Sequence, residues 1–343
     1  MFTFIPMGNG FRRAAPLALI VAFGLAACGG GYSGSGMGYG MSAGAGSKLF
    51  AADAGYPGIG SLINPDPPTG MVVVDRFFYA GGLTMSVGSL SLDTVNDRLY
   101  VGNGTSILVY NSASMATGIP SPDRTITGIT SAASLFIDAA NNHNRLYVGD
   151  AALGVKVFDP ADMANGMTTP SGFLTGNFGT TFQIGGVAVD ATKDILYVSN
   201  TTLTPTASSQ ISLFTASTAD GTKTPNVTIT PMSGMNNLSV AGIALDSTHD
   251  RLYVAGPAPT VMVFDAVSTL PGGATSPNRT ITLPGQIRSV AIDPVGDRLY
   301  AVALSGVAIY IVEAASTATG TPSVVKAIGA PYGNFTAVAV NPM

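Results

Sequence analysis

The sequence contains few of the side chains that most often carry catalysis. Among its 343 residues are one cysteine (Cys28), two histidines (His143 and His249) and one glutamate (Glu313). A single cysteine cannot form an internal disulfide, and the shortage of Cys and His argues against zinc sites and nucleophilic triads. Any acid–base pair would have to come from aspartate. Enzymatic activity is therefore disfavoured, and the residues identify neither a reaction nor a ligand.

Charged residues are also scarce. Lys, Arg, Asp and Glu make up 10% of the chain, hydrophobic residues make up 46%, and the net charge is −4. A composition this apolar suits stacked sheets and argues against disorder. Because no basic run follows Arg12 and Arg13, the sequence also argues against nucleic acid as a partner.

A repeated segment organises most of the chain. Its copies contain variants of Arg-Leu-Tyr-Val, whose tyrosines are Tyr100, Tyr147, Tyr197, Tyr253 and Tyr300. The copies recur at intervals of about 50 residues, a period typical of solenoids, propellers and arrays. Each copy holds four short runs rich in Val, Ile, Tyr, Phe and Thr, separated by Gly, Asn, Asp and Pro, which predicts an antiparallel four-stranded unit. Four strands per unit is the blade of a β-propeller.

The fourth copy illustrates the predicted strands, A at 242–245, B at 252–255, C at 261–264 and D at 279–282. Strands A to C are apolar on both faces, as blades that stack on each other require. Strand D reads RTIT, with the charge and hydroxyls expected of an exposed outer edge. Between strands A and B lies a D-x-x-x-D/N-R turn, whose aspartates we expect to bind backbone amides.

The two ends of the repeat region complete each other. Residues 336–343 form a strand A with no partners downstream, and KLFAAD at 48–53 aligns with RLYVGD at 145–150 as a strand B. Residues 61–64 and 71–79 are predicted as the matching strands C and D. We therefore expect an all-β fold, a six-bladed β-propeller with one composite closing blade that leaves no inner sheet edge unpaired. Five or seven blades are the alternatives if residues 62–79 have another role.

Residues 1–28 have the pattern of an export signal, because Arg12 and Arg13 precede an apolar run that contains Pro16 and is too short to span a bilayer. The run ends in Leu-Ala-Ala-Cys, which resembles the lipobox of bacterial lipoproteins. That resemblance implies cleavage before Cys28 and a diacylglycerol on its sulfur, which would anchor the chain in a membrane. Gly29 resembles the residue that follows this cysteine in lipoproteins of the Gram-negative outer membrane. An ordinary cleaved signal is the alternative.

Two further segments follow the predicted signal. Residues 29–47 are rich in Gly and Ser and free of charge, so we expect a flexible tether. Residues 48–343 contain no internal linker and are predicted to form one propeller domain.

Candidate ligand-binding residues come from the loops that join strand B to C and strand D to the next A, which share one face around the central channel. The candidates are Asp53, Asp150, Asn200, Phe182, Arg288 and Tyr332. Carboxylates, amides, aromatic rings and a guanidinium suit a glycan, a peptide or a small apolar ligand. The loop over 200–210 is longer than its siblings, and function tends to reside in such departures from a repeat. Both histidines fall in A-to-B turns on the opposite face, where they are predicted to be turn residues.

The repeated motif, Arg-Leu-Tyr-Val followed by Val-x-Val-Phe-Asp, resembles the repeats of bacterial propellers of the YVTN and NHL type. The resemblance extends from residue 48 to residue 343. Propellers of this type include lactonases, lyases, quinoproteins and binding modules, so the resemblance implies a fold and leaves the activity open. Related six-bladed lactonases hold a metal with Glu, Asn and Asp, and quinoproteins usually stack their cofactor on Trp. This chain has no Trp, and its one glutamate lies outside the channel-mouth loops.

Two readings of the function remain. The first is a non-enzymatic envelope lipoprotein whose propeller binds a protein, peptide or glycan without a cofactor. The second is a metal-dependent lactonase or hydrolase that holds Ca²⁺, a hard cation that prefers oxygen ligands, with Asp53, Asp150 and amide oxygens.

Overall fold

The computed structural model divides the chain into two units, Met1–Gly44 and Ala45–Met343. The structure describes only residues of the second unit, namely 48–53, 58–63, 76–78, 87–139, 144–151, 153–176, 178, 182–202, 208–231, 242–256, 258–306, 308–322, 326–329 and 334–341. The predicted signal, Cys28 and the tether up to residue 47 lie outside these ranges. Among the described residues no helix is long and apolar enough to cross a membrane.

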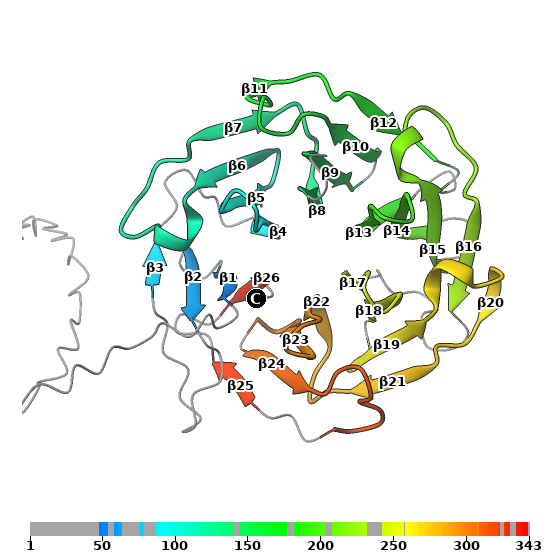
Figure 1. The fold of residues 1–343 in the computed structure, drawn as a ribbon. Coiled ribbons are helices and arrows are strands. Elements are labelled where there is room, and N and C mark those ends of the chain that lie inside the picture. The colour runs from blue at the N-terminus through cyan, green and yellow to red at the C-terminus, as the bar shows by residue number, and fades with distance from the viewer. Residues whose placement is uncertain are drawn as a thin grey trace, which may run out of the picture. The chain divides into compact units, whose positions relative to one another are not determined.

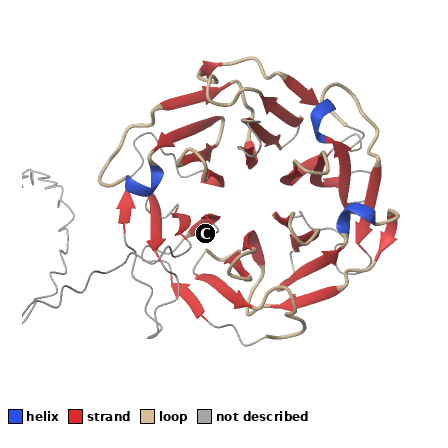
Figure 2. Ribbon diagram, in the orientation of Figure 1, coloured by secondary structure: helices blue, strands red, loops and turns tan. Residues whose placement is uncertain are grey.

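The second unit is an all-β ring of six small antiparallel sheets, which confirms the predicted six-bladed propeller (Figures 1 and 2). We number the sheets as blades along the chain, beginning with the sheet that contains both ends of the repeat region. Blade 1 contains β26 (Phe335–Asn341), β1 (Lys48–Asp53), β2 (Gly58–Ile63) and β3 (Arg76–Phe78). Blade 2 contains β4 (Val87–Asp93), β5 (Arg98–Asn103), β6 (Ser106–Asn111) and β7 (Arg124–Thr127). Blade 3 contains β8 (Ala132–Asp138), β9 (Arg145–Asp150), β10 (Gly154–Phe158) and β12 (Gly172–Leu174).

The other three blades repeat this order. Blade 4 contains β13 (Phe182–Asp190), β14 (Ile195–Thr202), β15 (Ser208–Thr215) and β16 (Val227–Pro231). Blade 5 contains β17 (Ile243–Asp246), β18 (Arg251–Ala255), β19 (Thr260–Asp265) and β21 (Arg279–Thr282). Blade 6 contains β22 (Ile287–Asp293), β23 (Arg298–Ala303), β24 (Ala308–Glu313) and β25 (Lys326–Gly329). The short strands β11 (Gly166–Met167) and β20 (Gly273–Thr275), with the 3₁₀ turns η1 (Ala113–Met115), η3 (Ala216–Thr218) and η4 (Val267–Thr269), complete the described elements.

Blade 1 is composite, as the sequence predicts. Strand β26 from the end of the chain pairs antiparallel with β1 over the whole length of β1, and β1 pairs with β2. Strand β2 begins three residues before the predicted segment 61–64. Gly58 and Gly60 weakened the sequence signal, since glycine is depleted in strands, but Ile59 between them is fully buried.

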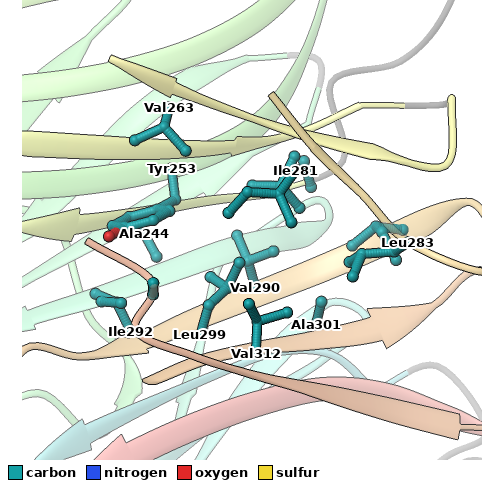
Figure 3. Packing of buried hydrophobic residues seen from close by; sticks show 14 residues of the cluster. Ala244, Tyr253, Val263, Ile281, Leu283, Val290, Ile292, Leu299, Ala301 and Val312 are labelled. Atoms are coloured by element: carbon teal, nitrogen blue, oxygen red, sulfur yellow. The ribbon is translucent and has the colours of Figure 1, made fainter. Parts of the chain in front are cut away.

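The core lies between the blades. The described residues form six clusters of buried hydrophobic side chains, and each cluster joins two neighbouring blades. The cluster between blades 5 and 6 contains Tyr253, Ile281, Val290 and Leu299 (Figure 3). The cluster that closes the ring joins Tyr300 and Ile309 of blade 6 to Leu49 and Val338 of blade 1. Both faces of strands B and C are buried, which explains why the repeats are apolar throughout these strands.

The tyrosines that mark the register lie inside this core. Tyr100, Tyr147, Tyr197, Tyr253 and Tyr300 are all fully buried. Burial raises the pKa of Tyr253 to about 12, and it also raises the pKa values of Tyr100, Tyr147 and Tyr197. The phenol groups of these four tyrosines therefore stay protonated to a higher pH than those of exposed tyrosines.

The outer edges of four blades are covered, contrary to the expectation of an exposed edge. Strand β11, from the loop between strands C and D of blade 3, pairs in parallel with β7 of blade 2, and β20 of blade 5 pairs likewise with β16 of blade 4. Single bridges take the place of these short strands at two other edges. Gly221 of blade 4 bridges to Leu174 of blade 3, and Gly320 of blade 6 bridges to Ile281 of blade 5. Both glycines have positive φ with open space around them, so the backbone conformation selects glycine there.

The arginine of each RTIT strand also connects its blade to the following blade. Arg124 donates to the carbonyl oxygens of Ala161 and Ala164 in blade 3, and Arg279 donates to those of Ala315 and Ala318 in blade 6. The charge in strand D thus binds the turn of the following blade in both copies.

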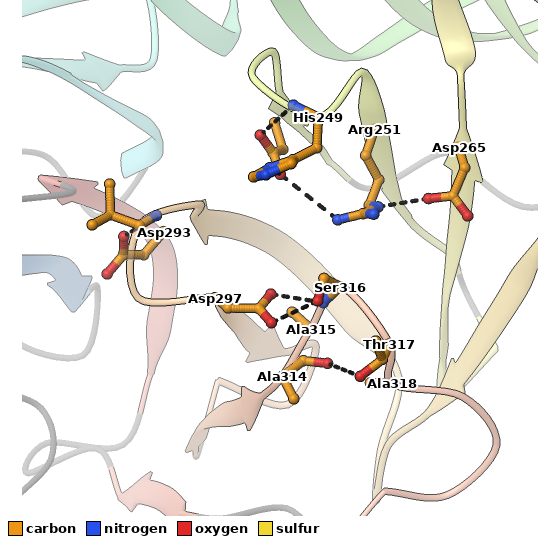
Figure 4. A network of polar contacts seen from close by, with 12 residues as sticks. His249, Arg251, Asp265, Asp293, Asp297, Ala314, Ala315, Ser316, Thr317 and Ala318 are labelled. Atoms are coloured by element: carbon orange, nitrogen blue, oxygen red, sulfur yellow. Dashed lines mark hydrogen bonds and ion pairs between the residues drawn. The ribbon is translucent and has the colours of Figure 1, made fainter.

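In blades 2, 4, 5 and 6, two aspartates of the turn between strands A and B hold the loop in place. The first accepts backbone N–H groups inside the turn, as Asp293 does from Val295 and Gly296. The second adopts a positive φ and binds a serine after strand C; Asp297 accepts from the Ser316 backbone at 2.7 Å and from its hydroxyl at 2.6 Å (Figure 4). The same link joins Asp97 to Ser114, Asp194 to Ser217 and Asp250 to Ser268. His249 lies in such a turn, with Nδ1 2.8 Å from the Asp246 carboxylate.

Candidate functional site: the central channel

The innermost strands of the six blades surround a channel. Strands β26, β4, β8, β13, β17 and β22 contact one another in this order, and β22 meets β26 again. The channel encloses a cavity of about 350 Å³. Its wall consists of small and apolar residues and hydroxyl groups, with Arg288 as the one charged residue in the described part; it includes Leu90, Ser91, Ala133, Leu135, Val290 and Val338.

Serine hydroxyls of the wall join neighbouring blades. Ser91 Oγ accepts from the Ile137 N–H at 2.9 Å, and Ser134 Oγ accepts from the Val187 N–H at 3.0 Å. Ser89 Oγ donates to the Ala132 carbonyl oxygen at 3.3 Å. Inner strands that diverge from each other around the channel are thus tied by side chains where backbone pairing is absent.

Most inner strands begin with a β-bulge. The register shifts by one residue between Val87 and Ser89, between Ala132 and Ser134, between Ile184 and Gly186, and between Ile287 and Ser289. The extra residues, which have no partner in the ladder, are Gly88, Ala133, Gly185 and Arg288, and all four line the channel. In β26 the extra residue is Thr336. Bulges re-aim side chains and are frequent next to functional sites.

Arg288 is the exception at this position. Its half-buried guanidinium makes one hydrogen bond to the described residues, from Nη1 to the Phe335 carbonyl oxygen at 3.5 Å, and no ion pair with them is present. Burial lowers its pKa. The other extra residues of the inner strands are small and uncharged, so blade 6 alone among these blades places a cation in the channel wall.

Asp150 lies at the end of β9 and is bound on every side. Its carboxylate accepts from the backbone N–H of Thr130 at 2.9 Å, from that of Ser131 at 3.0 Å and from Lys156 Nζ at 2.7 Å. Lys156 also donates to the Gly128 carbonyl oxygen at 2.8 Å. This buried pair holds the loop that leads from β7 into β8, which favours a structural role for Asp150.

Asp53 and Asn200 occupy the same place at the end of strand B in blades 1 and 4, and both are buried. The predicted long loop over 200–210 is partly a ladder, because Asn200 pairs with Gln210 and the pairing continues to Thr202 and Ser208. Asn200 Oδ1 accepts from Ser212 Oγ at 3.3 Å. Asn200 is therefore a buried residue within the sheet.

The remaining candidates are dispersed. Phe182 begins β13, and its ring centroid lies 5.0 Å from that of Phe178, beside the cluster between blades 3 and 4. Tyr332 and Cys28 lie outside the described residues. Asp53 and Asp150 come from blades 1 and 3, which blade 2 separates, and within the described ranges no three His, Cys, Asp or Glu side chains are placed to hold a metal ion together.

The sequence predicts Arg288 as a candidate residue but does not directly show the bulge that gives Arg288 its position. The signal was available: aligned on the aspartate or asparagine that ends strand A, the six copies read Gly88, Ala133, Gly185, Ala241, Arg288 and Thr336 at one position. Five of the six blades have a small residue at this position and blade 6 has an arginine, which indicates that blade 6 has a specific function there. The Lys156 partner of Asp150 was also missed, because this lysine lies in the otherwise apolar run Val-Lys-Val-Phe.

No protein-family model and no curated protein sequence matches this chain. Similarity appears among solved structures. A chain in a crystal structure of a nidogen/laminin complex has a TM-score of 0.54 and 13% identity, and the match covers 86% of this chain and 98% of that one. The propeller domain of Myceliophteria thermophila Cps50 (Swd1) has a TM-score of 0.54 and 13% identity over 83% of each chain. The WD40 propeller domain of Doa1 has a TM-score of 0.51 and 15% identity over 83% of this chain and 80% of that one. At these identities the comparisons show the β-propeller fold alone.

Proposed function

We propose that this protein is a ligand-binding module of the cell envelope, anchored by a lipid on Cys28 and tethered through residues 29–47. The observation that carries the binding role is the channel, whose cavity of about 350 Å³ has an apolar and hydroxyl-bearing wall with one cation. Small-molecule sites are typically concave, mostly apolar and supplied with a few polar groups. A propeller fold is consistent with such a scaffold.

The contacts of the Asp150 carboxylate with other residues of the protein support a binding function over metal-dependent hydrolysis. A metal held by this carboxylate would have to displace Lys156 Nζ, which lies 2.7 Å away, and two backbone N–H donors. Each lost contact to a buried charged group costs free energy. The channel therefore serves as a receptor for a ligand that enters at the face formed by the B-to-C and D-to-A loops.

The anchor is tested by a substitution outside the propeller. In a Gram-negative host, the full chain is expected in the outer-membrane fraction, and Cys28→Ser is expected to release it to the soluble periplasmic fraction, because stable membrane attachment needs the lipid chains. Radiolabelled fatty acid should be incorporated in the unaltered chain and not in the variant. Equal membrane association of both chains would contradict the anchor.

The binding role is tested by filling the channel. Ala133 lies in the wall at a bulge, so Ala133→Phe places a ring in the cavity. Native mass spectrometry of the full chain isolated from envelopes is expected to show a retained small molecule, and the variant is expected to lose it. Lys223→Ala, at an exposed position outside the channel wall, is the matched control. A ligand that survives Ala133→Phe would place binding elsewhere on the molecule.

A further inference from the structure

Arg288 is a cation without a carboxylate partner among the described residues. Several other basic side chains bind acids: Arg251 and Arg279 bind Asp265, Arg145 binds Asp159, and Lys156 binds Asp150. Arg124 instead donates to two carbonyl oxygens of the following blade. Arg288 makes only its 3.5 Å contact with the Phe335 carbonyl oxygen. A half-buried guanidinium has lost part of its hydration, and no partner in the described structure compensates for this loss.

The surroundings of Arg288 add no negative charge. The described wall of the channel contains neither aspartate nor glutamate, so an anion beside Arg288 would meet no acidic side chain of the wall. The bulge leaves Arg288 without a partner in the ladder, and Ser289, Val290 and Ile292 of the same strand also line the channel. An incoming ligand would therefore meet one cation at the start of β22 and a surface of apolar side chains and hydroxyl groups along the rest of the wall.

From this arrangement we infer that the channel binds a small organic carboxylate, whose carboxylate pairs with the Arg288 guanidinium and whose apolar body lies against the channel wall. The inference rests on the proposed binding function and specifies its ligand class. Guanidinium and carboxylate match in geometry and form two parallel charge-assisted hydrogen bonds. The cavity of about 350 Å³ is at the small end of the range for small-molecule sites, which suits a short ligand rather than a folded partner.

Calorimetric titration of the full chain with three probes of equal length tests this inference. Hexanoate, hexanol and hexylamine share the apolar body and differ in the head group. Hexanoate is expected to bind about tenfold or more tightly than hexanol, because a charge-assisted hydrogen bond contributes more than a neutral one. Hexylamine is expected not to bind. Inorganic phosphate serves as a fourth probe that offers an anion without an apolar body.

Variants assign the effect to the guanidinium. Arg288→Gln is expected to weaken hexanoate binding by about tenfold or more and to leave hexanol binding unchanged. Arg288→Lys should restore part of the affinity. Lys223→Gln removes the same unit of charge from an exposed loop outside the channel wall and should change nothing. The melting temperature of Arg288→Gln should equal or exceed that of the unaltered chain, because removing a poorly partnered buried charge costs little.

Several outcomes would overturn the inference. Equal affinity for hexanoate and hexanol, or hexanoate binding that survives Arg288→Gln, would show that no carboxylate pairs with this residue. Phosphate binding at Arg288 without hexanoate binding would assign the residue to inorganic anions. If a retained ligand is lost in Ala133→Phe but hexanoate does not bind, the binding function stands and the carboxylate assignment fails.

Discussion

Deletion of residues 335–343 is expected to abolish cooperative folding of the propeller. These residues contain β26, which pairs with β1 and contributes the buried side chains of Phe335, Ala337 and Val338. Burial of each large apolar side chain stabilises by about 1.5–3 kcal/mol, and the deletion also exposes the backbone edge of β1 and opens two clusters between blades. The summed loss approaches the whole stability of a typical domain, about 5–15 kcal/mol.

Circular dichroism and thermal unfolding of the truncated chain measure this loss. Deletion of residues 342–343 alone, which leaves β26 intact, is the control and should melt like the full chain. A truncated chain that retains a sharp transition at the original temperature would show that β26 does not close the ring.

Alkaline pH is expected to unfold the ring in one steep transition. Burial raises the pKa of five tyrosines, that of Tyr253 to about 12, above the ordinary value of 10.0; the others are Tyr100, Tyr110, Tyr147 and Tyr197. Their stabilising effect is fully present below pH 10, where folded and unfolded states are both protonated. Above pH 10 the unfolded state loses protons that the folded state keeps, so each tyrosine lowers the free energy of unfolding by about 1.4 kcal/mol per pH unit. The effects of the five residues add, so the free energy of unfolding falls steeply with pH in this range.

Tyrosinate absorbance and circular dichroism recorded against pH test this expectation. The part of the tyrosinate signal that comes from these five tyrosines should change together with the circular dichroism between pH 10 and 12, since their ionisation requires unfolding. Tyr197→Phe keeps the buried ring and removes one ionising group, so it should reduce the steepness by about 1.4 kcal/mol per pH unit. Ionisation of these tyrosines near pH 10 in a chain with unchanged circular dichroism would contradict the burial argument.

The sequence predicted the blades because each carries its own local signals. Alternating turn residues and β-branched runs place strand D of blade 5 at Arg279–Thr282, as the structure has it, and the missing partners at the two ends of the repeat region predicted the composite blade. The contacts between repeats could not be predicted in the same way. Asp297 and Ser316 bind each other although a whole hairpin separates them in the sequence, and nothing in the residues next to either one indicates its partner.

The candidate site was predictable only in outline. Position at the end of strand B selected Asp150 and Asn200, but their side chains do not bind the residues opposite them in the ladder, Gly154 and Gln210. Their partners are Lys156 and Ser212, two positions farther along the neighbouring strand. Arg288 was selected as a charge near strand A. Its place in the channel wall follows from a register shift that only the paired backbone reveals.

The overlap of successive blades bears on how such a ring can change its size. From blade 3 to blade 6, the loop between strands C and D always reaches back to the outer strand of the preceding blade. A duplicated unit therefore brings a cover for the blade before it and receives one from the blade after it. Ring size can change by whole units without leaving a bare strand at the rim, where another molecule could add by β-pairing.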